Sequence, residues 1–238
     1  MKKSIKTALK RLCGDPKCAR ERLLHTAGML YAERGLDAVS TRELTGEAGV
    51  NLAAIAYYFG GKDGLRDAVI DTVIERTRER VGPIVARLSR DVTEAGGDRR
   101  DLSRAAARFV RDYLGTTLPL GPENWTVTVV MRAMSTRSEA HDRLYDSVFA
   151  PMMNAVHQLT AAATGRDADD SKTRILATAI LGEVLTFRRN RPMVMKSLDW
   201  DTFTPDRVDQ ILDVVTPKVL ARLGLPLDAI KEPASEAV

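Results

Sequence analysis

The stretch STRELTGEAGVNLAAIAYYFGGK, residues 40–62, carries the signals that decide how this chain folds at its start. Ser40 and Glu43 form an S-x-x-E capping box, which predicts a helix start, and Gly49 predicts the end of that helix within about nine residues. Asn51 predicts the cap of a second short helix, LAAIAYYF, which a glycine pair ends. Two short helices joined by AGVN have the spacing of a helix-turn-helix.

The residues on either side of this pair predict further helices. Asp15 and Pro16 are typical of a helix cap and a first helical position, and Gly35 predicts the end of that helix. A helix is also predicted to run from Lys62 to Val81, where the Gly82-Pro83 pair predicts a kink or a break. We therefore expect a head of three helices, followed by a fourth helix that leads into the rest of the chain.

The remaining sequence predicts helices and loops without a sheet. Residues 124–134, NWTVTVVMRAM, are ambiguous because β-branched residues suit a strand, but no second strand lies nearby to pair with them, so we expect a helix. The fold class predicted is therefore all-α, with a three-helix head and a larger helical body. The longer helices of the body are predicted from about Glu139 to Ala163 with a kink at Pro151, from Ser171 to about Asn190, and from Thr204 to about Leu223.

Positive charge is concentrated at the start of the chain. Residues 1–62 hold 11 Lys and Arg against 6 Asp and Glu, a net charge of +5, whereas the whole chain has a net charge of +4. A basic first quarter of the chain, followed by a near-neutral remainder, suggests that a polyanion binds at the N-terminal end. On charge alone, a solvated basic surface is the alternative interpretation.

Composition does not indicate a membrane or secreted protein. No apolar run reaches the ~18 residues that a membrane span needs. The basic start MKKSIKTALKRL is not followed by the apolar region and cleavage site of a signal peptide. Cys13 and Cys18 are too few for a disulfide framework. We therefore expect a soluble, cytoplasmic protein.

In a helix-turn-helix, the second helix lies in the major groove of DNA. Here that helix is the predicted LAAIAYYF segment. Val50, Ile55 and Phe59 are predicted to face inward. Its outer face has no Arg, Lys or Gln, so base reading would rest on apolar contacts, such as alanine against a thymine methyl, and on tyrosine hydroxyls. The alternative is that both tyrosines pack in the core, but neighbouring helical residues lie about 100° apart and cannot both point fully inward. The residues predicted to face outward are Asn51, Leu52, Ala53, Ala54, Tyr57 and Tyr58.

Residues 20–65, RERLLHTAGMLYAERGLDAVSTRELTGEAGVNLAAIAYYFGGKDGL, resemble the DNA-binding domain of the tetracycline-repressor (TetR) family. The resemblance implies a homodimeric regulator of transcription, usually a repressor that a small ligand releases from its operator. Ala56 stands where much of the family has tyrosine, so one commonly used contact is missing. The positions that match the family's DNA contacts, together with the outward-facing Asn51, are Thr41, Arg42, Leu52, Ala53, Ala54, Tyr57, Tyr58 and Lys62.

Three later stretches are similar to the CerR/CecR branch of the same family: LYDSVFAPMMNAV (144–156), ATGRDADDSKTRILATAILGEVLTFRRNR (163–191) and SLDWDTF (197–203). This resemblance implies a helical domain that binds a ligand and forms a dimer. We expect four segments in all: a basic flexible arm over residues 1–15, a helix-turn-helix domain over 16–62, a ligand-binding and dimerisation domain over 63–225, and a flexible tail over 226–238.

The chain lacks the residue patterns of an enzyme or a metal site. His25, His141 and His157 are isolated in the sequence, and no glycine-rich phosphate loop, zinc-binding cysteine set or nucleophile elbow is present. The His141-Asp142 pair is interpreted as a helix start. Cys13 and Cys18, with His25, have a metal or thiol switch as an alternative, but their spacing fits no standard zinc pattern and a fourth ligand is missing. We expect no catalytic residue, metal or cofactor. The alternative function is a helical small-molecule-binding protein or enzyme whose helix-turn-helix no longer binds DNA.

Large flexible side chains in the body predict a pocket for an apolar or aromatic effector. For any single one of them, packing in the core is the alternative. Arg132, Tyr145 and His157 are the polar partners predicted for such a ligand. The residues predicted to line the pocket are Phe109, Tyr113, Trp125, Met131, Met134, Phe149, Met153 and Phe187.

The helix predicted over residues 171–190 is apolar on two faces, so it needs two partners. One face is large, with Leu176, Ile180, Val184 and Phe187, and is assigned to the chain's own core. The other face is small and is assigned to a two-fold-related copy, where the last helix completes a four-helix interface. The predicted interface residues are Ile175, Thr178, Ala179, Gly182 and Thr186, then Val208, Ile211, Leu212, Val215 and Val219.

Overall fold

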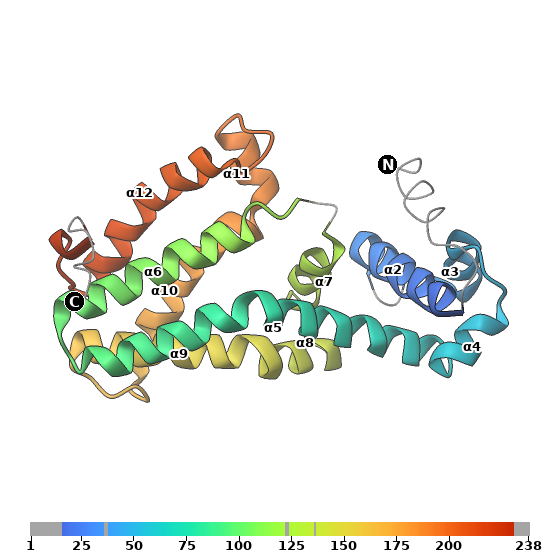
Figure 1. The fold of residues 1–238 in the computed structure, drawn as a ribbon, viewed down its shortest axis with the longest axis horizontal. Coiled ribbons are helices and arrows are strands. Elements are labelled where there is room, and N and C mark those ends of the chain that lie inside the picture. Colours follow the sequence, from blue (N-terminus) through green and yellow to red (C-terminus); the bar gives the residue numbers. More distant parts are fainter. Residues whose placement is uncertain (1–15, 36–37, 122–123, 136, 231–238) are drawn as a thin grey trace. The chain divides into compact units, whose positions relative to one another are not determined.

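The computed structural model describes residues 16–35, 38–121, 124–135 and 137–230. Every regular element in these ranges is helical, as the all-α prediction requires (Figure 1). The chain forms two compact units, the first from Met1–Arg76 with Pro122–Leu144 and the second from Thr77–Gly121 with Tyr145–Val238. None of the described helices is both long and apolar enough to cross a membrane.

The first unit begins with the three helices that the sequence predicted, α2 (Pro16–Arg34), α3 (Thr41–Ala48) and α4 (Ala53–Phe59). The Ser40 side chain accepts a hydrogen bond from the backbone N–H of Glu43 at 3.3 Å, so this half of the capping box is confirmed. Gly49 and Gly60, with φ of 65° and 73°, end α3 and α4 in the left-handed conformation that glycine adopts readily. The predicted cap Asp15 lies outside the described residues.

The ambiguous stretch after residue 124 is the helix α7 (Trp125–Ala133), as predicted, and α8 (Glu139–Leu144) follows it. Trp125 is 4% exposed and packs directly on α2. A Cβ atom added to Gly28 would lie only 2.5 Å from Cε3 of the Trp125 indole. The close approach of α7 to α2 therefore requires glycine at this position.

The predicted break at Gly82-Pro83 does not occur: α5 runs without interruption from Lys62 to Ala95. Pro83 lacks the N–H that would bond to the carbonyl of Glu79. Both residues are exposed, so the carbonyl can be hydrated, which lowers the cost of the missing donor, and the helix continues.

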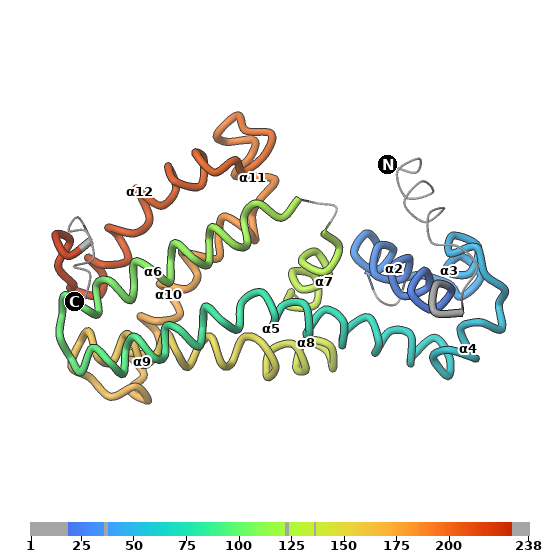
Figure 2. Tube along the Cα trace, viewed as in Figure 1, coloured from blue at the N-terminus to red at the C-terminus, as the bar shows by residue number. Residues whose placement is uncertain are grey.

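The second unit contains α6 (Arg99–Thr117), α9 (Ala150–Thr164), α10 (Ser171–Arg189), α11 (Arg191–Ser197) and α12 (Pro205–Arg222). Within this unit α12 packs along α6, and α9 packs along α10 (Figure 1, Figure 2). Their inward faces and the second half of α5 bury one apolar core. Residues 226–230, predicted to begin a flexible tail, instead pack against α6: Ala229 is 1% exposed, and the Ser103 hydroxyl donates to the Pro226 carbonyl at 2.9 Å.

The single helix predicted over 139–163 is three pieces, because a π-helical turn, Tyr145–Phe149, separates α8 from α9. Pro151 lies in the first turn of α9 and has no N–H to donate to the carbonyl of Ser147. Arg78 of α5 donates to that carbonyl from Nε at 2.9 Å. The predicted proline kink is therefore a local π-helical turn supported by an arginine from another helix.

Candidate nucleic-acid interface

The three head helices form one small core, which fixes the directions of their outer faces. Leu23 of α2, Leu44 of α3 and Ile55 of α4 are 0–2% exposed. The Nε atom of Arg22 donates to the carbonyl of Ala48 at 3.2 Å, which ties the end of α3 to α2. This arginine was not predicted from the sequence, because no local pattern marks it for a contact with a residue 26 positions away.

The first turn of α3 is also held to α2. Glu43 forms an ion pair with Arg34 at the other end of α2, so its carboxylate does not complete the predicted capping box. Arg132 of α7 donates from Nη2 to the carbonyl of Glu33 at 2.9 Å. The Arg34–Glu43 pair holds the start of α3, where Thr41 is half-buried and Arg42 is exposed.

The turn between α3 and α4 is built by Asn51. Its Oδ1 accepts a hydrogen bond from the backbone N–H of Ala54 at 2.9 Å, which confirms its predicted role as a helix cap. The side chain remains exposed beside the outer face of α4. One lone pair of its oxygen is therefore used by the backbone, and its second lone pair and its amide N–H groups are left to meet a ligand.

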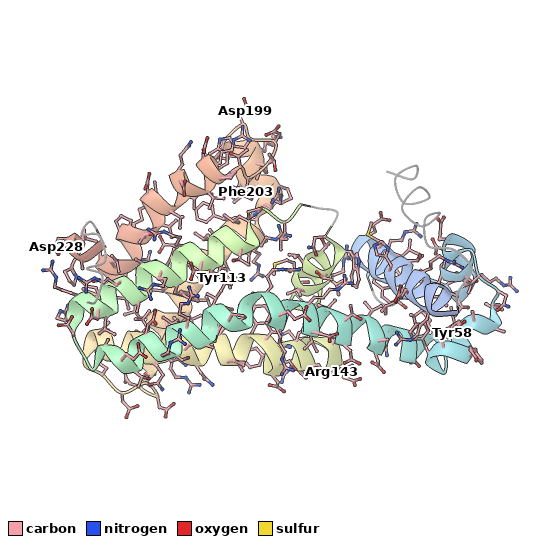
Figure 3. The ribbon with its side chains drawn as sticks, in the orientation of Figure 1. Tyr58, Tyr113, Arg143, Asp199, Phe203 and Asp228 are labelled. Atoms are coloured by element: carbon pink, nitrogen blue, oxygen red, sulfur yellow. The ribbon has the colours of Figure 1, made fainter. Side chains whose placement is uncertain are left out.

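The outer face of α4 carries the most exposed aromatic side chain of the head. Tyr57 is 82% exposed, and its ring meets that of half-buried Tyr58 edge-to-face with centroids 4.9 Å apart (Figure 3). Neither tyrosine is core, while Val50 and Phe59, predicted to face inward, are half-buried. The guanidinium of Arg20 lies 5.2 Å from the ring centroid of Phe59.

One residue of the predicted outer face is placed differently. Ala54 is only 8% exposed, so the prediction that it faces outward is wrong. The inward strip of a helix can be wide enough to take in two neighbouring residues, and here Ala54 joins Ile55 in it. The exposed face consists instead of Leu52, Ala53, Ala56 and Tyr57.

Two basic side chains border this face without internal partners. Arg42 near the start of α3 and Lys62 at the first position of α5 form no ion pair within the described part of the chain. The acids beside them in sequence are engaged, because Glu43 pairs with Arg34 and Asp63 pairs with Arg66 at 3.4 Å. The positive end of the α5 dipole also lies at Lys62. An apolar and aromatic helix face bordered by unpaired positive charge can bind a polyanion.

The first unit also holds a cleft of about 590 Å³ lined by charged residues of α2 and α5 and by Trp125. Arg76 lies over the Trp125 ring, 5.4 Å from its centroid. Burial, with a smaller contribution from the charge of Arg76, lowers the pKa of His25. Within the residues that the structure describes, no three His, Cys, Asp or Glu side chains are grouped to hold a metal ion. Cys13 and the side chain of Cys18 lie outside these residues.

The residues predicted for the effector pocket are divided between the two units, so a pocket made by all eight remains a prediction. Phe109 and Tyr113 lie together on α6 with ring centroids 6.0 Å apart, and burial raises the pKa of Tyr113 against the opposing charge of Arg188 (Figure 3). Among the proposed polar partners, His157 is 8% exposed and its Nε2 has no hydrogen-bond partner among the described residues. The second unit holds Phe109, Tyr113, Phe149, Met153 and Phe187, and the first holds Trp125, Met131 and Met134.

The two faces predicted for α10 differ in exposure as expected. Ile180 and Val184 are 2% and 0% exposed, whereas Ile175 is 69% exposed and Thr178, Ala179 and Gly182 are exposed beside it. The prediction for α12 is wrong for four residues, because they fill the chain's own core and are unavailable to a second copy. These are Val208, Ile211, Val215 and Val219, each 4% exposed or less; Leu212 is half-buried.

Comparison with known proteins gives matches along most of the chain. The model of the N-terminal domain of bacterial regulatory proteins of the tetR family matches residues 23–69. The model of the C-terminal domain of the HTH-type transcriptional dual regulator CecR matches residues 99–224. The dual regulator CecR of Shigella flexneri is 27% identical over 201 residues, which cover 83% of this chain and 88% of that protein. A probable HTH-type transcriptional regulator of Bacillus subtilis (strain 168), YttP, is 36% identical over 56 residues, which cover 24% of this chain and 27% of that protein.

Solved structures share the fold. A TetR-like transcriptional regulator from Rhodococcus sp. RHA1 has a TM-score of 0.59 at 16% identity, covering 86% of this chain and 96% of that one. AibR, solved in complex with isovaleryl coenzyme A and operator DNA, has a TM-score of 0.56 at 16% identity, covering 84% of this chain and 97% of that one. At these identities the likeness establishes the fold alone.

Proposed function

Since this chain belongs to the TetR family of bacterial transcriptional regulators and has a C-terminal domain of the CecR type, we propose that it is a homodimeric repressor. It binds a palindromic operator and is released from it by a small apolar or aromatic effector. The observation that carries the DNA-binding part is the exposed face of α4, with Arg42 and Lys62 near the starts of the two neighbouring helices and without ion pairs among the described residues.

In this proposal α4 lies in the major groove and its neighbours hold the backbone. Arg42 and the Tyr57 hydroxyl face base edges, while Lys62 and the positive end of α5 face phosphates. Asn51 and Thr41 contact the backbone or bases near the ends of α3 and α4. Ala54 is not included, since it is buried.

The dimer is proposed to form through the exposed face of α10. Ile175 is 69% exposed, and a Cβ atom added to Gly182 would meet no atom within 4 Å, so this surface is open to close approach by a second helix. Val214 of α12, 53% exposed, replaces the four buried α12 residues as a contact. Two heads in such a dimer would meet half-sites about 34–36 Å apart.

The effector is proposed to bind among the large side chains of the body, with Phe109, Tyr113, Phe149, Met153 and Phe187 as its lining. It releases DNA only if it binds better to a form whose heads are wrongly spaced. A hundredfold loss of operator affinity needs a preference of about 2.7 kcal/mol, within the usual range of coupling energies. AibR, which shares this fold, was solved with both isovaleryl coenzyme A and operator DNA bound, and this supports an effector here.

The test is selection of binding sites by the full chain from a pool of random-sequence DNA duplexes. A palindromic consensus is expected, and a panel of apolar aromatic compounds should then contain members that release the labelled consensus duplex. Enrichment of no sequence would overturn the proposal in favour of a helical small-molecule-binding protein or enzyme. A promoter reporter carrying the consensus should be silenced by the chain; activation would limit the proposal to DNA binding without repression.

A further inference from the structure

The exposed face of α4 is nearly free of hydrogen-bonding groups. Leu52 is 54% exposed and Tyr57 is 82% exposed, with exposed Ala53 and Ala56 between them. The only side-chain polar atom among these four residues is the Tyr57 hydroxyl. The basic residues of the head border this face rather than form part of it.

The side-chain amide of Asn51, next to this face, adds little to its hydrogen-bonding capacity. The commonest amide readout of DNA is a two-bond contact to adenine, which uses both the oxygen and the nitrogen of the side chain. The oxygen of Asn51 already accepts the backbone N–H of Ala54 at 2.9 Å. The cap fixes the position of this oxygen, so a two-bond contact that turns the amide away from Ala54 would give up the cap of α4.

Apolar side chains favour one kind of group in the major groove. A base donor or acceptor that meets such a side chain loses its water and gains no hydrogen bond in return. The C5-methyl group of thymine is the apolar feature of the groove, so it is the group that gains by the contact. Alanines also keep the side-chain layer thin, which lets the helix backbone approach the base edges closely.

The spacing of the face suits a row of such groups. Leu52 and Ala56, like Ala53 and Tyr57, are four residues apart and lie one above the other on the helix. One helical turn rises about 5.4 Å, while successive bases of a strand are about 3.4 Å apart. The face therefore spans two or three adjacent base pairs.

We propose that this regulator identifies its operator mainly through C5-methyl groups of pyrimidines, which Leu52, Ala53 and Ala56 contact in each half-site. The inference rests on the proposed function, in that it requires α4 to lie in the major groove. Thymines are the expected bases at two or three adjacent positions. A 5-methylcytosine at such a position presents the same methyl group and is expected to replace thymine in part.

The experiment replaces thymine by deoxyuridine, which removes the methyl group and keeps every hydrogen-bonding atom. The duplex is the consensus obtained by selection with the full chain, and each thymine is replaced in turn. Burial of one methyl group is worth about 0.8 kcal/mol, so about fourfold weaker binding is expected for each contacted methyl. In Leu52→Ala, the affinity lost on replacing thymine by deoxyuridine should shrink toward none at one position. Lys62→Ala should lower the affinity for the thymine and the deoxyuridine duplex alike and leave the ratio of the two affinities unchanged.

The outcomes separate the inference from the function it rests on. If the chain selects a consensus but every deoxyuridine duplex binds like its parent, methyl readout is overturned while DNA binding stands. If no consensus is selected, the proposed function fails together with the inference. If methyl loss weakens binding equally in wild type and Leu52→Ala at every position, Leu52 contacts no methyl group and its assignment is overturned.

Discussion

The apolar surfaces that α4 exposes in the first unit and α10 exposes in the second are built in opposite ways. The seven residues of α4 rely on the Asn51 cap and a closing glycine, and its best exposed side chain is a large aromatic, Tyr57. The nineteen residues of α10 are anchored by a buried face and expose a branched side chain, Ile175, beside small ones.

The charges around the two faces also differ. The face of α4 is bordered by Arg42 and Lys62, which have no ion-pair partner among the described residues. Beside α10, Glu183 pairs with Arg222 of α12 at 3.3 Å, while Lys172, Arg174 and Arg189 of α10 are exposed. An apolar face beside unpaired cations suits a polyanion, while a branched side chain among small exposed ones suits close packing against a protein surface. The difference in shape and in acidic content supports the proposal that α4 binds DNA and α10 a second copy.

The largest effect is expected from an arginine placed on the α10 face. Gly182→Arg should give monomers in sedimentation, and operator affinity should fall more than a hundredfold because the two heads lose their linkage. Gly115→Arg on α6 is the matched control, since both glycines are exposed and helical with no atom within 4 Å of an added Cβ. A Gly182→Arg dimer that keeps its affinity would place the interface on another surface.

Removing the unpaired arginine beside α4 should have the next-largest effect. Arg42→Ala should cost about 1–3 kcal/mol of operator binding, concentrated at one base pair if the side chain reads a guanine. Competition with single-base operator variants measures this. Arg66→Ala is the control, because Arg66 is bound to Asp63 at 3.4 Å and is expected to contribute little. Equal losses for both variants would contradict the distinction between paired and unpaired charge.

Removing the arginine that supports the proline turn at the start of α9 should have a smaller effect, which is on stability. Arg78→Met should lower the free energy of unfolding by about 0.5–1 kcal/mol, since it removes the donor to the Ser147 carbonyl. In a Pro151→Ala background the N–H of residue 151 can take that role, so the same change should become nearly neutral. Denaturant titration of the four proteins measures the coupling. Additive effects would show that the arginine acts independently of the proline.

The smallest effect is a pH dependence from the buried histidine of α9. Burial, with the charge of Arg174, lowers the pKa of His157, and Asp169 opposes this. The unfolded chain then binds the proton more readily, so stability is complete above about pH 6.5 and declines as the pH falls through that range. His157→Leu should decline less between pH 7 and 5 in thermal melts. An identical decline in both proteins would remove His157 as a cause.

Local signals predicted the head well, because each acts within a few residues. Ser40 and Asn51 cap α3 and α4, and Gly49 ends α3, as their neighbours in sequence indicate. Burial is decided by distant contacts instead. Ala54 was therefore placed on the wrong face, and four apolar residues of α12 were assigned to a partner although they fill the chain's own core.

Prolines were overestimated as helix breakers for a related reason. Pro83 leaves one carbonyl without a donor, but that carbonyl belongs to exposed Glu79 and the helix continues. At Pro151 the missing donor is replaced by Arg78, which lies more than 70 residues earlier in the chain. The short helix α11 was not predicted, since its seven residues include no buried side chain to set a pattern.

The measurement that tests the central claim most directly is the salt dependence of operator affinity for wild type and Lys62→Ala. If α4 lies in the groove with Lys62 on a phosphate, the slope of log affinity against log salt should become shallower by about one, with weaker binding to all sequences alike. An unchanged slope and affinity would contradict the placement of the α4 face and its border on DNA.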